Sequence, residues 1–312
     1  MTAMTTLRTV LVLIFAPAVL ALSQAASFHL RHRNSDTIVS SRTEREYLLH
    51  VPERYDRSRP TSLVITMHGG SMWPAAQAKL DGWRRVADEH GFIVVYPSAM
   101  SGRGPRAWAA GVGPRQAREV RFISDLIDTL SARYNIDATR IYANGLSNGG
   151  GMAFALSCAL GDRIAAIGLV APAIFMSWSA CADPRPVPMI VFHGTADPVT
   201  RYHGGKTWVA PIVFPDIPRF VATWARRNGC APSPVDSSTA TDVSRRRFID
   251  CANGASVDFY TIEGGGHTWP GGTKLSEWFA GVTSNGVDAS EQMWQFFHAN
   301  PWRVVRTAAR PR

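Results

Sequence analysis

Apolar and polar positions follow two periods along this chain. Short apolar runs predict strands at residues 47–51, 63–67, 92–96, 141–144, 165–170, 189–193 and 257–262, and the first two are ended by Pro52 and by His68-Gly69-Gly70. Apolar residues that recur every three or four positions predict helices at residues 80–90, 120–134, 147–160, 219–228 and 289–298. Residues 103–118 and 199–216 fit neither period, and we expect them to be loops or insertions.

The alternation of strands with helices predicts βαβ units, and therefore a mostly parallel sheet with helices on both faces. We expect one domain at residues 26–300 and a basic tail at residues 301–312, because no Gly/Ser linker or internal repeat divides the chain. A content of 46% hydrophobic and 18% charged residues is typical of a globular protein with a substantial core.

The first residues have the features of an export signal. Arg8 precedes an apolar run at residues 10–22, and Ser23-Gln24-Ala25 supplies small residues for cleavage. We therefore predict a signal peptide at residues 1–25 and a secreted protein. The alternative is an uncleaved anchor, but the run is shorter than the roughly 20 residues that a spanning helix needs. No stable membrane insertion is expected after cleavage.

The four cysteines are Cys158, Cys181, Cys230 and Cys251. In an oxidising compartment an even number of cysteines indicates disulfides, and three pairings are possible. We favour Cys158 with Cys181 and Cys230 with Cys251, since each pair closes a loop of about 20 residues and stabilises by about 3 kcal/mol. The alternative is that some remain free buried thiols. Their spacing is not that of metal ligands, so no metal site is predicted.

A net charge of +9 raises the question of an acidic partner. The one tight basic run is Arg245 to Arg247, and other arginines lie in the C-terminal tail. Neither stands beside a helix-turn-helix or RNA-binding motif. The charge therefore predicts a solvated face and no nucleic-acid partner.

Gly145-Leu146-Ser147-Asn148-Gly149 matches the GxSxG nucleophile elbow, between a predicted strand and a predicted helix. The glycines are needed because the serine lies on a strained turn, where side chains two residues away would collide with backbone. Ser147 is the predicted nucleophile.

A serine hydroxyl needs a base, and the base needs an acidic group that selects its tautomer. In this arrangement the chain order is Ser, then Asp or Glu, then His. The later histidines are His193, His203, His267 and His298. His267 is favoured because it lies in a glycine-rich loop after a strand, whereas His203 and His298 are expected to be packing or surface residues.

Asp197 is the predicted orienting carboxylate, because it directly follows the strand at residues 189–193. The alternative for Asp197 is an Asx turn before Pro198. Asp216 lies in a predicted insertion and Asp258 inside a predicted strand, so both are weaker candidates.

The oxyanion of a tetrahedral intermediate needs preorganised N–H donors. One predicted donor is the backbone N–H of Asn148. The other is expected in the loop after the strand at residues 63–67, with Gly70 as first choice and Ser71 as second. His68 is expected to brace this loop.

The chain resembles the polyhydroxybutyrate depolymerase-like and feruloyl esterase-like α/β-hydrolases. The resemblance rests on the blocks REYLLHVP (45–52), HGG (68–70), VVYP (94–97), IDATRIYANGLSNGG (136–150), HGTADP (193–198) and GGGHTWPGG (264–272). It implies an α/β-hydrolase fold and a secreted serine carboxylesterase that needs no metal or cofactor, and it supports the favoured cysteine pairs.

The substrate expected first is an ester of hydroxyalkanoate oligomers, cleaved through an acyl-enzyme. The alternative is a feruloyl, cinnamoyl or acetyl ester of plant cell-wall polysaccharide. Trp108 and Trp269 are the residues expected to form an aromatic wall for the substrate, with packing as the alternative role. A serine peptidase and a non-catalytic binding protein are the remaining alternatives.

Overall fold

The computed structural model describes residues 36–100, 106–181, 185–207 and 212–302. The predicted signal peptide lies outside these residues, as does the predicted tail beyond Trp302. From Thr37 onward the chain forms one compact unit. None of the helices within the described residues is long and apolar enough to cross a bilayer.

The central sheet has ten strands within the described residues, in the order β1-β2-β4-β3-β5-β6-β7-β12-β11-β10. Its six central strands, from β4 to β12, are parallel, while β2, β11 and β10 run antiparallel to their neighbours. This confirms the predicted mostly parallel sheet of the α/β-hydrolase fold. The strands are β1 (Asp36–Ser40), β2 (Thr43–His50), β3 (Thr61–Met67), β4 (Ile93–Pro97), β5 (Ile136–Leu146), β6 (Ala166–Val170), β7 (Met189–Gly194), β10 (Val235–Ala240), β11 (Val243–Phe248) and β12 (Val257–Ile262).

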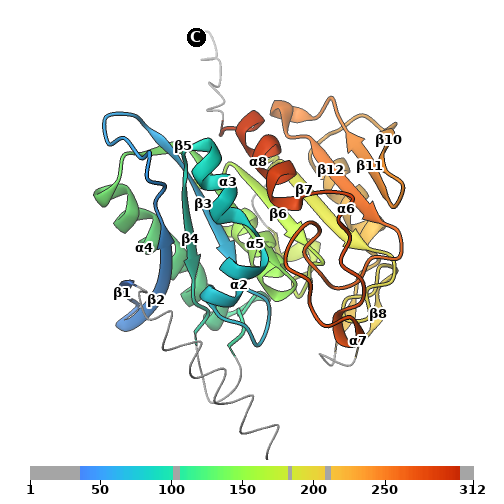
Figure 1. Cartoon of the computed structure of the whole chain (residues 1–312), viewed down its shortest axis with the longest axis horizontal. Helices are drawn as coiled ribbons and strands as arrows, with labels where there is room; N and C mark the ends of the chain where they lie inside the picture. Colours follow the sequence, from blue (N-terminus) through green and yellow to red (C-terminus); the bar gives the residue numbers. More distant parts are fainter. Residues whose placement is uncertain (1–35, 101–105, 182–184, 208–211, 303–312) are drawn as a thin grey trace, which may run out of the picture. The chain divides into compact units, whose positions relative to one another are not determined.

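Helices cover both faces of the sheet, as predicted. They are α2 (Pro74–Leu80), α3 (Trp83–His90), α4 (Pro114–Arg133), α5 (Asn148–Ala159), α6 (Ile217–Arg227), α7 (Glu277–Ala280) and α8 (Ala289–Ala299). Helices α3 and α8 lie on the near face in Figure 1, where the rings of Trp83 and Tyr142 both stack on Phe297. On the other face, Phe154 of α5 contacts Phe220 and Trp224 of α6.

Two helices begin three or more residues from their predicted starts. The helix expected at residues 80–90 begins at Trp83, because Gly82 has a left-handed φ of 70° and separates α3 from α2. Helix α4 begins at Pro114, inside the expected loop at residues 103–118. Its first buried side chain is Glu119, so the first turn carries no apolar periodicity that the sequence could reveal.

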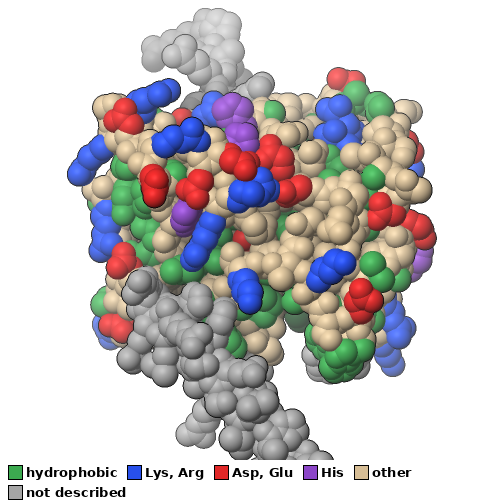
Figure 2. Space-filling model, in the orientation of Figure 1, with side chains coloured by type: hydrophobic (Ala, Val, Ile, Leu, Met, Phe, Trp, Pro, Cys, Tyr) green, Lys and Arg blue, Asp and Glu red, His purple; other side chains and the backbone are tan. Residues whose placement is uncertain are grey.

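The hairpin of β10 and β11 was not predicted. Strand β10 is almost entirely exposed and polar, so it lacks the alternation that identifies a half-buried strand. Strand β11 contains Arg245 to Arg247, whose side chains form ion pairs with Asp258 and Asp236. The basic run therefore lies in the strand next to the edge strand β10, and its arginines have intramolecular partners. Figure 2 shows basic and acidic side chains interspersed over the face that it presents.

The segment at residues 199–216, expected as a loop, contains a short hairpin of β8 (Gly205–Lys206) and β9 (Val213–Phe214). The disulfides join Cys158 to Cys181 and Cys230 to Cys251, which is the favoured pairing. None of the four cysteines is free. Disulfides of this kind are typical of proteins from oxidising compartments.

Candidate active site

The predicted triad residues follow strands that end at one edge of the sheet. Ser147 directly follows β5, Asp197 lies three residues beyond β7, and His267 lies five residues beyond β12. The four strands β5, β6, β7 and β12 are parallel neighbours, so their carboxyl ends lie together (Figure 1). Open α/β sheets place their ligand sites at this edge.

Ser147 occupies a strained turn between β5 and α5. Its φ of 55° lies in the left-handed region, which a side chain rarely adopts. A Cβ atom on Gly145 would lie 2.6 Å from the Met67 carbonyl oxygen, and one on Gly149 would lie 2.6 Å from that of His68. The two glycines therefore allow β3 to pass close to the turn, for the reason that the motif predicts.

His267 and Asp197 contact each other directly. Nδ1 of His267 lies 2.8 Å from Oδ2 of Asp197, and both side chains are buried. An Nδ1–H that donates to a carboxylate leaves Nε2 as the atom that can accept a proton. The structure thus brings together the histidine and the carboxylate that the sequence selects.

The carboxylate of Asp197 is held from two sides. Its Oδ1 accepts hydrogen bonds from the backbone N–H groups of Val199 and Thr200, each at 2.8 Å. Burial alone would raise the pKa of Asp197, but the charge and hydrogen bond of His267, with smaller contributions from His193 and Thr200, lower the pKa below its usual value. Asp197 is therefore ionised at neutral pH.

Ser147 forms no hydrogen bond with His267 in the described part of the chain. The hydroxyl group of Thr200 links the two loops instead: Thr200 Oγ1 lies 3.2 Å from His267 Nδ1 and 3.1 Å from the Ala171 carbonyl oxygen. Ala171 follows Val170, whose carbonyl accepts the N–H of Ser147 at 2.9 Å. In proteins without substrate, catalytic hydrogen bonds are often long and shorten in the substrate complex.

Sequence reasoning missed two residues beside Asp197. Thr200 was not selected, and its hydroxyl lies 3.0 Å from Asp197 Oδ2. His193 was considered as the base and not selected. Its Nε2 lies 2.6 Å from the Thr200 carbonyl oxygen and 3.5 Å from Asp197 Oδ2. Burial lowers the pKa of His193, so its neutral ring donates from Nε2 and ties β7 to the aspartate loop. The one sequence feature that could have indicated Thr200 and His193 is their closeness to Asp197 along the chain.

The glycine loop after β3 lies against the nucleophile. A Cβ on Gly69 would lie 3.7 Å from Ser147 Cβ, and one on Gly70 would lie 3.8 Å from Asn148 Cβ. The N–H of Ser71 donates to the Arg106 carbonyl at 2.8 Å, whereas that of Gly70 has no acceptor among the described residues. Asn148 is the first residue of α5, where N–H groups have no acceptor within the helix. This arrangement favours Gly70 over Ser71.

His68 braces the glycine loop from the core, as expected. Burial lowers the pKa of His68 to about 4, so its imidazole is neutral at pH 7. Its Nδ1 donates to the Gly69 carbonyl at 2.8 Å, and its Nε2 accepts the N–H of Ala99 at 3.1 Å. The ring therefore connects the loop after β3 to the chain after β4.

The expectation that Trp108 lines a substrate wall is wrong in this structure. Its side chain is 3% exposed, and its indole N–H donates to the His68 carbonyl at 3.1 Å. Its backbone N–H and carbonyl also bond the side-chain amide of Asn148, at 2.6 and 3.1 Å. Trp108 therefore holds the glycine loop and the start of α5 in register.

We expect Trp108→Phe to lower kcat about tenfold with little change in KM, because a buried His68 carbonyl loses its donor and the loop loses its fixed position. Steady-state kinetics with p-nitrophenyl acetate measures this effect. Trp178→Phe, which changes a tryptophan packed against α5 and α6, is the control. An unchanged kcat in Trp108→Phe would contradict the bracing role.

Trp269 was also expected to contact substrate, and the structure contradicts this expectation. The side chain is fully buried, and its indole N–H donates to Oγ of Ser290 at 3.0 Å. The ring packs the loop that follows His267 against the start of α8. Nearness in sequence to a catalytic residue did not decide which way the ring points.

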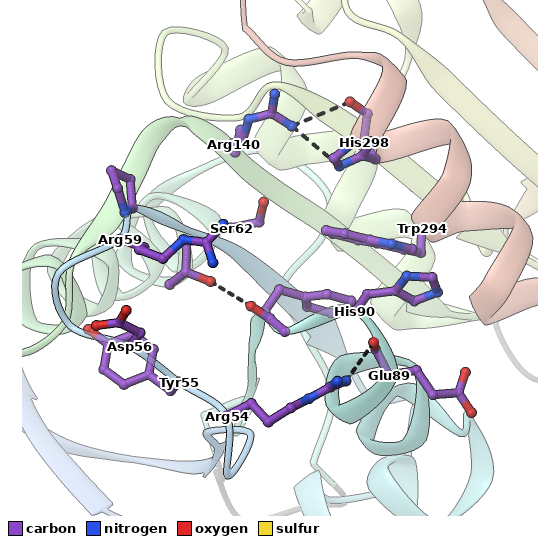
Figure 3. A pocket seen from close by; sticks show the side chains of 14 residues that line it. Arg54, Tyr55, Asp56, Arg59, Ser62, Glu89, His90, Arg140, Trp294 and His298 are labelled. Atoms are coloured by element: carbon purple, nitrogen blue, oxygen red, sulfur yellow. Dashed lines mark hydrogen bonds between the residues drawn. The ribbon is translucent and has the colours of Figure 1, made fainter.

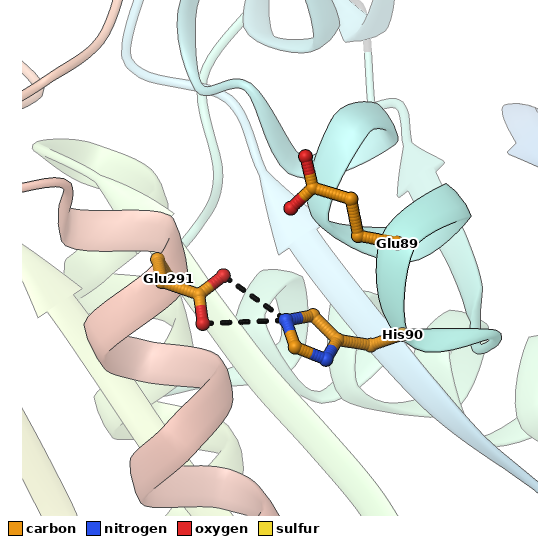
Figure 4. Close-up of side chains that lie close together, drawn as sticks. All are labelled: Glu89, His90 and Glu291. Carbon is orange, nitrogen blue, oxygen red and sulfur yellow. Dashed lines mark hydrogen bonds and ion pairs between the residues drawn. The ribbon is translucent and has the colours of Figure 1, made fainter.

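Two polar features lie at the opposite edge of the sheet. A cavity of about 490 Å³ is lined by residues near the amino ends of β3 and β4, among them Arg59, Ser62 and Trp294 (Figure 3). Beside it, Nε2 of His90 lies 3.1 Å from the Glu291 carboxylate, with Glu89 nearby (Figure 4). Glu89 is already paired with Arg85, at 2.9 Å. Neither feature includes a residue of the predicted triad.

Comparisons with known proteins agree with this geometry. The profile of the family described as esterase PHB depolymerase matches residues 46–252. Feruloyl esterase B of Piromyces equi is 30% identical over 236 residues, which cover 72% of this chain and 42% of that protein. Feruloyl esterase C of Emericella nidulans is 26% identical over 262 residues, which cover 82% of this chain and 84% of that protein.

The solved structure of acetyl xylan esterase from Aspergillus awamori is similar, with a TM-score of 0.58 and 16% identity. The match covers 75% of this chain and 94% of that one. At such identity the likeness shows a common fold. The chain spans 42% of the length of the Piromyces equi protein, so the activity of that whole protein is not transferred by similarity alone.

Proposed function

Because the chain belongs to the esterase PHB depolymerase family, we propose that it is a secreted serine esterase that cleaves feruloyl esters of plant cell-wall polysaccharide. The contact of His267 Nδ1 with Asp197 Oδ2 at 2.8 Å, at the same sheet edge as the strained Ser147, carries the proposed chemistry. The similarity to feruloyl esterases supports the acyl group, and it favours a feruloyl ester over the hydroxyalkanoate ester that the sequence first suggested. Two disulfides support secretion.

In the proposed first step, Ser147 Oγ attacks the ester carbonyl carbon while Nε2 of His267 takes the hydroxyl proton. The negative charge of Asp197 stabilises the imidazolium that forms. The carbonyl oxygen becomes an oxyanion that accepts hydrogen bonds from the N–H groups of Gly70 and Asn148. The positive end of the α5 dipole lies at the same point and adds to this stabilisation.

In the second half, the tetrahedral intermediate collapses and the bond to the leaving alcohol breaks. His267 gives its proton to that alcohol, which is a sugar hydroxyl in the proposed substrate. Water then enters, loses a proton to His267 and attacks the acyl-enzyme carbonyl. The second tetrahedral intermediate collapses as the bond between Ser147 Oγ and the acyl carbon breaks, and His267 returns its proton to Oγ. The free acid is released and Ser147 is regenerated, so protons and charge balance over the cycle. No cofactor takes part in this sequence.

A substrate series tests the proposal. We expect kcat/KM to be highest for methyl ferulate, lower for p-nitrophenyl acetate, and lower still for hydroxybutyrate oligomers and a peptide amide. A preference for hydroxybutyrate oligomers would instead support the second candidate, which rests on the family description. A preference for the amide would overturn the esterase assignment altogether.

A further inference from the structure

Helix α7 exposes two aromatic rings at the catalytic edge of the sheet. Trp278 is 87% exposed and Phe279 is 43% exposed. Among the tryptophans that the structure describes, Trp278 alone is exposed. Figure 2 shows hydrophobic side chains gathered where α7 lies in Figure 1. Water-exposed rings of this size are costly to leave unburied, and contiguous exposed apolar surface marks binding sites.

The segment that carries these rings is attached to the loop of the catalytic histidine. The N–H of His267 donates to the Ala280 carbonyl, and the N–H of Gly266 donates to the Val282 carbonyl at 2.8 Å. Because consecutive Cα atoms lie 3.8 Å apart, the Cα of Trp278 is within about 8 Å of that of Ala280. The rings therefore have a defined position relative to His267.

Close backbone packing makes the attachment rigid. A Cβ on Gly281 would lie 2.9 Å from the Cα of Gly266, which shows that the two glycines touch. The hydroxyl of Thr268 adds a hydrogen bond to the Val282 carbonyl at 3.3 Å. The two rings are 5.9 Å apart at 66°, so they present differently oriented faces. Because the backbone that carries the rings is held in place, it has little conformational freedom to lose on binding.

The polar neighbours of the rings indicate what they bind. Lys274, Ser276 and Glu277 are exposed on the same segment as Trp278 and Phe279. Apolar rings bordered by hydrogen-bonding side chains match a sugar, which has an apolar C–H face and a polar edge. A polyester offers only carbonyl acceptors along its chain, whereas a sugar also has hydroxyl groups that can donate to the Glu277 carboxylate.

We propose that Trp278 and Phe279 form a binding subsite for the carbohydrate chain that carries the ester, apart from the point of cleavage. This inference rests on the proposed function, because it takes the alcohol part of the substrate to be a polysaccharide. A short methyl ester ends at the triad, whereas a polymer continues along the edge of the sheet and covers α7. The subsite therefore distinguishes polymeric from small substrates.

The test measures binding without turnover, in the full chain with Ser147→Ala. The probe is soluble arabinoxylan in native affinity gels, which gives a dissociation constant from the retardation of the protein. We expect Trp278→Ala to weaken binding about tenfold, because tryptophans dominate the energetics of contact surfaces. Trp278→Phe should restore part of the binding. Val39→Ala, an exposed residue of β1, is the matched control and should bind like its parent.

Several results would overturn the subsite: no retardation of the parent, equal retardation in Trp278→Ala, or equal losses in Trp278→Ala and Val39→Ala. A Trp278-dependent adsorption to polyhydroxybutyrate film, with none to arabinoxylan, would overturn the carbohydrate assignment. Failure of the proposed function is a separate result. An enzyme that binds arabinoxylan through Trp278 but does not cleave methyl ferulate would overturn the feruloyl esterase assignment and leave the subsite.

Discussion

Ser147→Ala is expected to lower kcat for p-nitrophenyl esters at least about 10⁴-fold, because the covalent acyl-enzyme can no longer form. The change removes one oxygen atom from a turn whose backbone strain at φ 55° remains. We therefore expect the far-UV circular dichroism spectrum and the thermal midpoint to stay close to those of the parent. Activity is measured with short-chain p-nitrophenyl esters, and mass spectrometry of a trapped acyl-enzyme identifies the modified residue.

The control for this variant is Ser177→Ala, which changes an exposed serine in the segment after β6. It should retain parental kinetics. Full activity in Ser147→Ala would show that another group is the nucleophile. Acylation of a residue other than Ser147 in the parent would lead to the same conclusion.

Asp197→Asn is the second large effect, with an expected fall in kcat of about 10⁴-fold and a small change in KM. The amide oxygen can still accept the N–H groups of Val199 and Thr200, so the loop keeps its form. The amide NH₂ then faces His267 Nδ1, where Oδ2 now lies at 2.8 Å. Because the amide NH₂ is a donor, Nδ1 must accept its hydrogen bond, and the imidazole proton moves to Nε2. A protonated Nε2 cannot take the proton of Ser147.

Asp216→Asn is the matched control, since Asp216 was the weaker sequence candidate for the same role. The structure places Asp216 at the start of α6, where it accepts the N–H of Arg219 at 2.8 Å and lies 2.9 Å from His203. Asparagine caps a helix as well as aspartate does. We expect activity within about twofold of the parent. A fall equal to that of Asp197→Asn would refute the assignment of Asp197.

Part of the candidate site can be predicted from short stretches of sequence, whereas another part depends on contacts between residues far apart in the chain. The GxSxG turn around Ser147 and the glycine-rich loop before His267 can each be recognised from a few neighbouring residues. Asp197 was selected by its place after a strand, and the parallel order of β7 and β12 brings it to His267. Each of these choices depends on periodicity and turn residues, which short windows of sequence contain.

The two tryptophan predictions failed for the opposite reason. Trp108 and Trp269 are near the site, but the direction of each ring depends on a partner far along the chain. His68 accepts the indole N–H of Trp108 from 40 residues away, and Ser290 accepts that of Trp269 from 21 residues away. No pattern in the sequence indicated that Trp278 is exposed, because the burial of a side chain depends on which distant segments pack against it.

The sequence by itself determined the alternation of strands and helices, the favoured cysteine pairs and the three residues proposed as the triad. These follow from local periodicity, loop lengths and turn chemistry. The tertiary structure alone decided which loop amide remains available beside Ser147, since the N–H of Ser71 is taken by Arg106. It also decided which aromatic rings reach solvent, because contacts between distant segments bury Trp269 and leave Trp278 exposed, two residues before Ala280, whose carbonyl accepts the N–H of His267.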